Sequence, residues 1–291
     1  MSPRLEDEIE ASAVAAEIVM LRAASNRAIL LVEGPSDANF FFHFVNQETC
    51  EIVIAYGKGN VIGALTLVRA KTMDGVVCVI DADFQPFVGP PASDKDVLLT
   101  DDHDLEIMLF RSPAFEKVLT EYGSARKVRD FRKTAGGARE IIIRSAHPLG
   151  IFRLYSLEHN VHLRFRELKY TFVDRKTLKV DIDAMILVVH NHSMLRLIDD
   201  KPIKAFINKW LNTDHDPWQM CCGHDLIEIF AKALQSYLGS RRAIEVDYAN
   251  VERALRLAYS FDNFSQSNLF SAIRSWEERN RPYICLRSPI A

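Results

Sequence analysis

Carboxylates stand directly after two apolar runs of the sequence, and their placement is typical of a site for a hard cation. Glu33 follows the run AILLV (28–32), and Asp81 and Asp83 follow the run VVCVI (76–80). Side chains two residues apart in an extended backbone point the same way, so Asp81 and Asp83 would share a face. Grouped carboxylates repel one another unless a cation is bound, and Mg²⁺ prefers ligands that are all oxygen. These residues therefore predict a magnesium site, in which Mn²⁺ could substitute.

Three further acids are candidates for the same site. Asp37 follows a Gly-Pro turn just after Glu33, and Asp104 and Glu106 begin a helical stretch after the run VLL (97–99). The carboxyl ends of strands in an open parallel sheet form the edge where ligands bind, so acids placed there would converge. The alternative is that these acids cap helices separately and never meet, since the helix dipole favours acids at N-termini.

The segment YGKGNV (56–61) is a candidate for holding a phosphate group. Gly57 and Gly59 permit a tight turn, and Lys58 brings a positive charge to the start of a helix. The chain contains no G-x-x-x-x-G-K-[ST] segment, which is the motif of P-loop NTPases. We therefore expect that this chain does not hydrolyse nucleotides by itself.

The elements that must position these residues follow an α/β pattern. Short runs that are apolar throughout alternate with helical stretches, as in parallel strands covered on both faces. The sequence predicts a Rossmann-like domain with a mostly parallel sheet at 27–110, preceded by a helix in 1–26 and followed by a mainly helical region at 111–291. Strands are predicted at 28–32, 52–55, 76–80 and 97–99, helices at 37–46, 61–71 and 103–109, and a β-hairpin insertion at 163–180.

The net charge of −3 hides a strongly basic block. Residues 126–179 contain 14 Lys and Arg against 5 Asp and Glu, a balance of +9 that leaves −12 for the remainder. Such a block beside an acidic cluster suits a metal-dependent enzyme that acts on a polyanion, while the alternative is ordinary segregation of charge on solvated faces. The residues predicted to contact nucleic acid are Arg126, Lys127, Arg129, Arg132 and Lys133.

The sequence also indicates the cellular location of the protein. Its N-terminal stretch is acidic where a signal peptide would be basic, and no apolar run approaches the roughly 20 residues of a membrane helix. The five cysteines show no CxxC spacing, and CCGHD (221–225) lacks the spacing of recognised structural zinc sites. We therefore expect reduced thiols, a cytoplasmic protein without a membrane partner, and a capped helix that begins near Asp225.

Four segments together resemble the toprim domain of topoisomerases, primases and nucleases of the overcoming-lysogenisation-defect type. They are VEGPSD (32–37), GKGN (57–60), DAD (81–83) and DLE (104–106). The resemblance implies that Glu33 is a metal ligand or general acid/base, and that Asp81 and Asp83 are metal ligands. It further implies that Asp37, Glu106 and Asp104 complete a two-metal site and that Lys58 neutralises the scissile phosphate.

The resemblance is closest to the nuclease branch. Gln85 stands where topoisomerases carry a third alternating aspartate. The segments TDDHDLE (100–106), CCGHDLIEIF (221–230) and NLFSAIRSWEE (268–278) look like those of toprim nucleases of PARIS-type anti-phage systems. That likeness implies a Mg²⁺-dependent endonuclease acting on RNA, such as tRNA, or on DNA, controlled by an ABC-type ATPase partner, with a homodimer as a further expectation.

Two other readings of the same residues remain open. The segment VVCVIDADF (76–84) also suits a haloacid-dehalogenase phosphatase, or the Asp-x-Asp of a sugar-nucleotide transferase, although neither uses Glu33. A catalytically inert interaction module, whose acids are structural, is the third reading.

Overall fold

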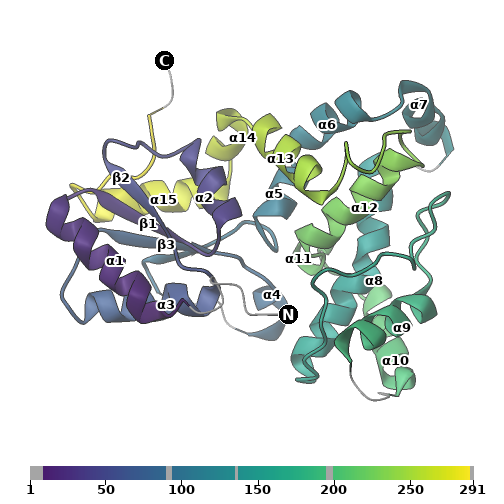
Figure 1. Cartoon of the computed structure of the whole chain (residues 1–291), viewed down its shortest axis with the longest axis horizontal. Coiled ribbons are helices and arrows are strands. Elements are labelled where there is room, and N and C mark those ends of the chain that lie inside the picture. The colour runs from purple at the N-terminus through teal and green to yellow at the C-terminus, as the bar shows by residue number, and fades with distance from the viewer. Residues whose placement is uncertain (1–8, 90–93, 135–136, 195–198, 289–291) are drawn as a thin grey trace. The chain divides into compact units, whose positions relative to one another are not determined.

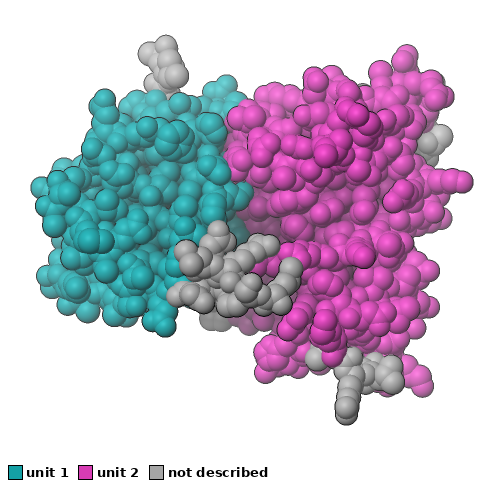
Figure 2. Space-filling model, viewed as in Figure 1, with its two compact units in different colours: residues 1–82, 90–101, 260–291 teal, residues 83–89, 102–259 magenta. Residues whose placement is uncertain are grey.

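The computed structural model describes residues 9–89, 94–134, 137–194 and 199–288, with the backbone alone at residues 132–134. Contacts divide the chain into two compact units, coloured separately in Figure 2. The first contains residues 1–82, 90–101 and 260–291, and the second contains residues 83–89 and 102–259. These units differ in extent from the predicted boundaries, because residues 260–291 belong to the sheet unit and residues 83–89 and 102–110 belong to the helical unit.

The first unit is built on one four-stranded parallel sheet (Figure 1). Its strands are β1 (Ala28–Val32), β2 (Cys50–Ile54), β3 (Val76–Ile80) and β4 (Val97–Leu99), in the order β2-β1-β3-β4. β1 and β3 are buried along their whole length, as continuous apolar runs in a covered parallel sheet should be. The prediction of a mixed α/β fold with a parallel sheet is therefore confirmed.

Helices cover both faces of this sheet (Figure 1). On one face, α1 (Ala11–Ala24) and α3 (Lys58–Arg69) pack over alternate residues of β1 and β3, such as Ile29 and Cys78. The remaining residues of β1 and β3 are also buried. α2 (Pro35–Phe42) contributes Phe40 to an aromatic cluster with Phe264 on α14 (Phe261–Ser265). The helix predicted in residues 1–26 is confirmed over the described part, and residues 1–8 lie outside the described ranges.

The C-terminal helix α15 (Asn268–Arg279) belongs to the sheet unit because of two sets of polar contacts. The buried indole of Trp276 donates to Oδ1 of Asp96 at 2.9 Å, just before β4. At its N-terminus, the carboxylate of Asp101 accepts from the amides of Asn268 and Leu269, both at 2.7 Å. A carboxylate that satisfies two amides at a helix N-terminus fixes where that helix begins.

The second unit is helical in its described residues, apart from loops. α5 (Leu105–Arg111), α8 (Ala138–Glu158) and α12 (Gly223–Gln235) pack together at its centre. The other helices of this unit are α4 (Gln85–Val88), α6 (Ala114–Tyr122), α7 (Ala125–Thr134), α9 (Ile182–Ser193), α10 (Asp200–Leu211), α11 (Pro217–Met220) and α13 (Tyr248–Ala258). Across the described parts of both units, no helix combines the length and the apolar character that crossing a bilayer requires.

The predicted β-hairpin at 163–180 is wrong. The alternating pattern is real, because Leu163, Phe165 and Leu168 are buried while the residues between them are exposed. The backbone pairs with side chains instead of a second strand, however: the amides of Leu163 and Arg164 donate to hydroxyl groups on α8 and α9, and Val173 and Val180 form an isolated antiparallel bridge. We call residues 162–180 the strap, a segment of loops and turns that lies against these helices.

Replacing Trp276 by Phe should lower the free energy of unfolding by about 1–3 kcal/mol, because Asp96 would lose a buried hydrogen-bond donor. Denaturant titration followed by circular dichroism measures this loss. Trp210→Phe, at a half-buried indole on α10, is the matched control. A loss for Trp276→Phe no larger than the loss for Trp210→Phe would contradict the assigned role.

Candidate functional site

The strand order creates a switch point between β1 and β3. From β1 the chain goes to β2 on one side, and it then crosses back to place β3 on the other side of β1. Connections that leave neighbouring strands in opposite directions open a crevice at the carboxyl ends of those strands, where ligands of such folds bind. Glu33 directly follows β1 and Asp81 directly follows β3, so both lie at the switch point.

Glu33 and Asp81 are in direct contact. Oε1 of Glu33 accepts a hydrogen bond from the backbone N–H of Asp81 at 2.9 Å. The backbone carbonyl of Glu33 accepts from the N–H of Gly57 at 2.9 Å, which ties in the loop after β2. Gly57 has φ +126°, a conformation that other residues rarely adopt, and this requirement explains the glycine. The Glu33 carboxylate is therefore oriented by the protein itself.

Lys58 and Asp37 lie at the same edge of the sheet. Nζ of Lys58, the first residue of α3, donates to the backbone carbonyl of Asp81 at 2.8 Å. Oδ2 of Asp37 accepts from the N–H of Gly34 at 2.8 Å and so holds the turn between β1 and α2. Among the predicted magnesium ligands, Glu33, Asp37 and Asp81 thus lie on the loops at this edge of the sheet in the first unit.

The other predicted ligands, Asp83, Asp104 and Glu106, belong to the second unit. Asp83 has a left-handed backbone with φ +50°, and its N–H donates to the carbonyl of His103 at 2.8 Å. Asp104 caps α5, with Oδ1 accepting from the N–H of Ile107 at 2.8 Å. Glu106 stands in the first turn of α5, where burial raises its pKa. These three acids gather around the start of α5.

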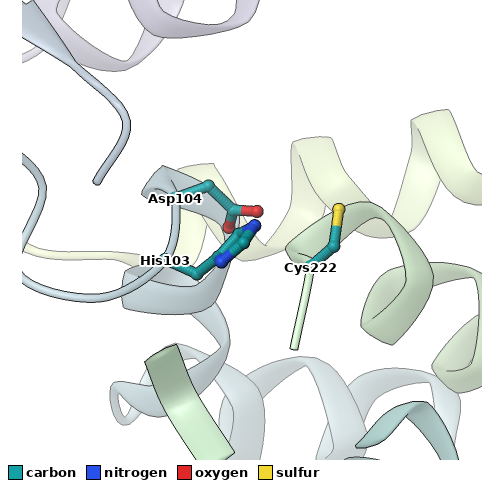
Figure 3. Close-up of side chains that lie close together, drawn as sticks. All are labelled: His103, Asp104 and Cys222. Carbon is teal, nitrogen blue, oxygen red and sulfur yellow. The ribbon is translucent and has the colours of Figure 1, made fainter. Parts of the chain in front are cut away.

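The start of α5 also lies against the start of α12. Oδ2 of Asp104 accepts from the N–H of Gly223 at 2.7 Å, which brings the neighbouring Cys222 into place. His103, Asp104 and Cys222 can each offer one ligand atom, and these atoms all lie within 4.8 Å of one another. Figure 3 shows the Asp104 carboxylate next to the imidazole ring of His103, with the Cys222 side chain to one side of them.

Burial disfavours the charged form of each member of this cluster. It lowers the pKa of His103 and so favours the neutral imidazole. It raises the pKa of Asp104, with the charge of Glu106 adding to the effect. It also raises the pKa of the Cys222 thiol. A cation bound among the three would offset this cost by stabilising the ionised carboxylate and thiolate.

A cavity of about 380 Å³ opens beside the cluster, within the second unit. Its wall includes His103 and Cys222 together with Arg153 on α8, Asn160 in the turn after α8, and His162 on the strap. Arg153 is held in place by two hydrogen bonds to the fully buried Asp225, at 2.7 and 2.8 Å. Arg153 therefore presents a fixed positive charge to a cavity whose lining is part polar and part apolar.

The basic residues predicted to contact nucleic acid differ in their surroundings. Arg126 and Arg129 are exposed on α7. Nζ of Lys127 instead donates to the carbonyls of Ser236 and Gly239, both at 2.6 Å. The side chains of Arg132 and Lys133 lie outside the described parts of the structure. The strap adds exposed basic residues that the sequence did not single out: Arg164, Arg166, Lys169, Arg175, Lys176 and Lys179.

His103 and Cys222 were not among the predicted site residues. No local motif links them, because 119 positions separate the two residues. The sequence pattern CCGHD predicts a helix start, and α12 does begin there, at Gly223. The nearby His224 packs against the ring of Tyr248, with centroids 4.3 Å apart, and is not a member of the cluster. Only the packing of α12 against α5 identifies Cys222.

Replacing Gly223 by Ala should lower the free energy of unfolding by about 1–3 kcal/mol through overpacking. A Cβ atom at this position would lie 2.3 Å from Oδ1 of Asp104 and 2.4 Å from Cβ of Glu106. Thermal and denaturant unfolding measure the loss. Gly59→Ala, in a helix and with open space around its Cβ, is the control and should not destabilise. Equal stability of the two variants would contradict the close approach of α12 to α5.

A comparison of the chain with protein-family models found no matching model, and a comparison with curated proteins found no similar sequence. The function must therefore be inferred from the chemistry of the chain's own residues.

Proposed function

We propose that this protein is a Mg²⁺-dependent endonuclease of the toprim type that hydrolyses phosphodiester bonds of RNA or DNA. The observation that carries the proposal is the contact between Glu33 and Asp81 at the switch point between β1 and β3. A carboxylate after the first strand and an aspartate after the third are the arrangement that the toprim resemblance implies. The phosphatase and sugar-transferase alternatives give Glu33 no role.

The donor set at the switch point fits magnesium. Glu33, Asp37 and Asp81 supply carboxylate oxygens, the ligand type that Mg²⁺ takes in proteins. The carboxylates of Glu33 and Asp37 are each oriented by a backbone N–H, as a preorganised ligand requires. Bound there, Mg²⁺ would activate a water and stabilise charge on the leaving oxygen. Asp83, Asp104 and Glu106 remain predicted metal ligands.

Two groups of basic residues suit the handling of a polyanion. The ammonium of Lys58 is held beside Asp81 and would neutralise charge on the scissile phosphate. In the second unit, Arg126 and Arg129 on α7 and the exposed side chains of the strap would bind the phosphate backbone of the substrate. Because such contacts read charge rather than bases, they suit RNA and DNA alike.

The biological setting is proposed from the resemblance alone. It is that of a cytoplasmic effector in a bacterial anti-phage system, held inactive or triggered by an ABC-type ATPase, and assembled as a homodimer. Within the chain, the missing P-loop motif is in keeping with nucleotide hydrolysis by a partner.

Replacing Glu33 by Gln should reduce Mg²⁺-dependent cleavage of tRNA or DNA by at least about 100-fold. The amide keeps an oxygen for the N–H of Asp81 but removes the negative charge that would hold the metal. Gel assays of the purified chain, with and without its candidate ATPase partner, measure the rate. Glu48→Gln, which removes an exposed carboxylate from the same unit, should leave cleavage unchanged. Equal cleavage by wild type and Glu33→Gln would refute the assigned role of Glu33.

Removing two arginines of the strap, as Arg164→Ala with Arg166→Ala, should weaken nucleic-acid binding and lower its salt dependence. The slope of log K against log salt should fall by about 1.4–1.8, since each phosphate contact contributes roughly 0.7–0.9. Fluorescence anisotropy over a salt series measures the slope. Lys201→Ala with Lys209→Ala, on exposed positions of α10, removes equal charge and should not change it. An unchanged slope in the strap variant would exclude the strap from the interface.

A further inference from the structure

Three side chains with different donor atoms meet in the second unit, and two of them have no part in the proposed nuclease reaction. His103 offers nitrogen, Asp104 offers oxygen and Cys222 offers sulfur, within 4.8 Å of one another (Figure 3). His103 and Asp104 are buried and Cys222 is half-buried. Mixed nitrogen, oxygen and sulfur donors are typical of Zn²⁺ sites, whereas Mg²⁺ and Ca²⁺ take oxygen ligands.

The imidazole of His103 is held in the tautomer that a metal ligand needs. Nδ1 lies 3.0 Å from the backbone carbonyl of Gln219. A carbonyl oxygen can only accept, so Nδ1 carries the proton and Nε2 carries the lone pair. A histidine that binds metal commonly donates its other N–H to a carbonyl or carboxylate in this way, which fixes the ring.

Asp104 is also fixed before any ion binds. Its two oxygens accept from the amides of Ile107 and Gly223, at 2.8 and 2.7 Å. The second of these amides follows Cys222 directly, so one hydrogen bond sets the spacing between the oxygen and sulfur donors. Ligands of a tetrahedral zinc ion lie about 3.3–3.8 Å apart, given bonds of about 2.0–2.3 Å. The donor atoms of the cluster, within 4.8 Å of one another, would have to move closer to hold the ion.

The cavity next to the cluster gives an ion a route in and leaves room for a further ligand. His103 and Cys222 both line this space of about 380 Å³. Three protein ligands with a position open to a cavity are the arrangement of zinc sites that bind water or substrate, whereas structural sites are closed by four protein ligands.

We propose that His103, Asp104 and Cys222 form a Zn²⁺ site in the second unit, with its fourth position open to the adjacent cavity. This site is distinct from the magnesium site proposed at the switch point between β1 and β3. In this proposal Asp104 is a zinc ligand and no longer one of the predicted magnesium ligands.

Cobalt is the probe for this site, because Co²⁺ bound to a thiolate absorbs in the near ultraviolet and Zn²⁺ does not. The full chain, freed of metal by a chelator and kept reduced by a phosphine, should develop a thiolate-to-cobalt absorption that saturates at one equivalent. One equivalent of Zn²⁺ should abolish it, since Zn²⁺ binds such sites more tightly than Co²⁺. A wild-type chain that develops no such absorption would overturn the proposal.

Variants locate the site. Cys222→Ser should remove the absorption and weaken Co²⁺ binding by at least about 100-fold, the upper range for changes around a metal. Cys221→Ser, at the buried neighbouring thiol, is the matched control and should retain both the absorption and the affinity. Should Cys222→Ser fail to fold by circular dichroism, His103→Gln is the second variant, with affinity reduced at least about 10-fold. Absorption that persists in a folded Cys222→Ser chain, or unchanged affinity in His103→Gln, would refute the site.

Competition with magnesium separates this proposal from the nuclease. A large excess of Mg²⁺ should leave the cobalt absorption unchanged, and Glu33→Gln should bind Co²⁺ like wild type. Displacement of cobalt by Mg²⁺ would show one shared site and would overturn the assignment of Asp104 to zinc. These measurements detect metal binding and not cleavage. The zinc-site proposal can therefore be refuted while the nuclease proposal is supported, and the nuclease proposal can be refuted while the zinc site is supported.

Discussion

Parallel pairing between β1 and β3 is the constraint on which the proposed active site depends. In this register Val32 lies opposite Val79, so the two strands end at the same edge and the N–H of Asp81 meets the Glu33 carboxylate at 2.9 Å. Both strands are buried throughout, which leaves their ends as the places where polar side chains can reach solvent. The helices on both faces secure this pairing, and the three loops at that edge then carry the residues of the site.

The carboxylates of this chain differ in the kind of hydrogen-bond partner that the structure gives them. In the acidic cluster at 94–106, five members have clear structural partners. Asp94 and Asp96 pair with Arg69, Asp101 caps α15, Asp102 pairs with Arg111, and Asp104 caps α5. Most acids of this cluster therefore cap helices or form ion pairs separately, as the alternative to a shared metal site supposes. Glu33 accepts from the backbone amide of Asp81, at the end of a neighbouring strand instead of at a helix N-terminus.

The sequence was most informative where burial alone decides the structure. The runs at 28–32, 76–80 and 97–99 are strands with the predicted bounds, because a strand buried on both faces is marked by apolar residues at every position. The sequence could therefore predict that Glu33 and Asp81, which directly follow two such strands, lie at one edge of the sheet. The strap shows the limit of this reasoning: alternation predicts which residues are buried, but it does not state what the backbone pairs with. Neither the attachment of α15 through Trp276 nor the approach of Cys222 to His103 has a local signature, since both depend on contacts between distant segments.

The two proposed metal sites need not compete for ions, because their donor atoms differ in kind. Carboxylate oxygens at the sheet edge favour a hard, hydrated ion such as Mg²⁺, which exchanges readily and suits a reaction on phosphate. The sulfur and nitrogen donors of Cys222 and His103 favour Zn²⁺, which binds more tightly and holds its ligands in a set geometry. Asp104 joins the start of α5 to the start of α12 through the amide of Gly223, so an ion bound beside it would also reinforce the packing of these two helices. On this view zinc would stabilise the helical unit, while magnesium would serve the chemistry at the sheet.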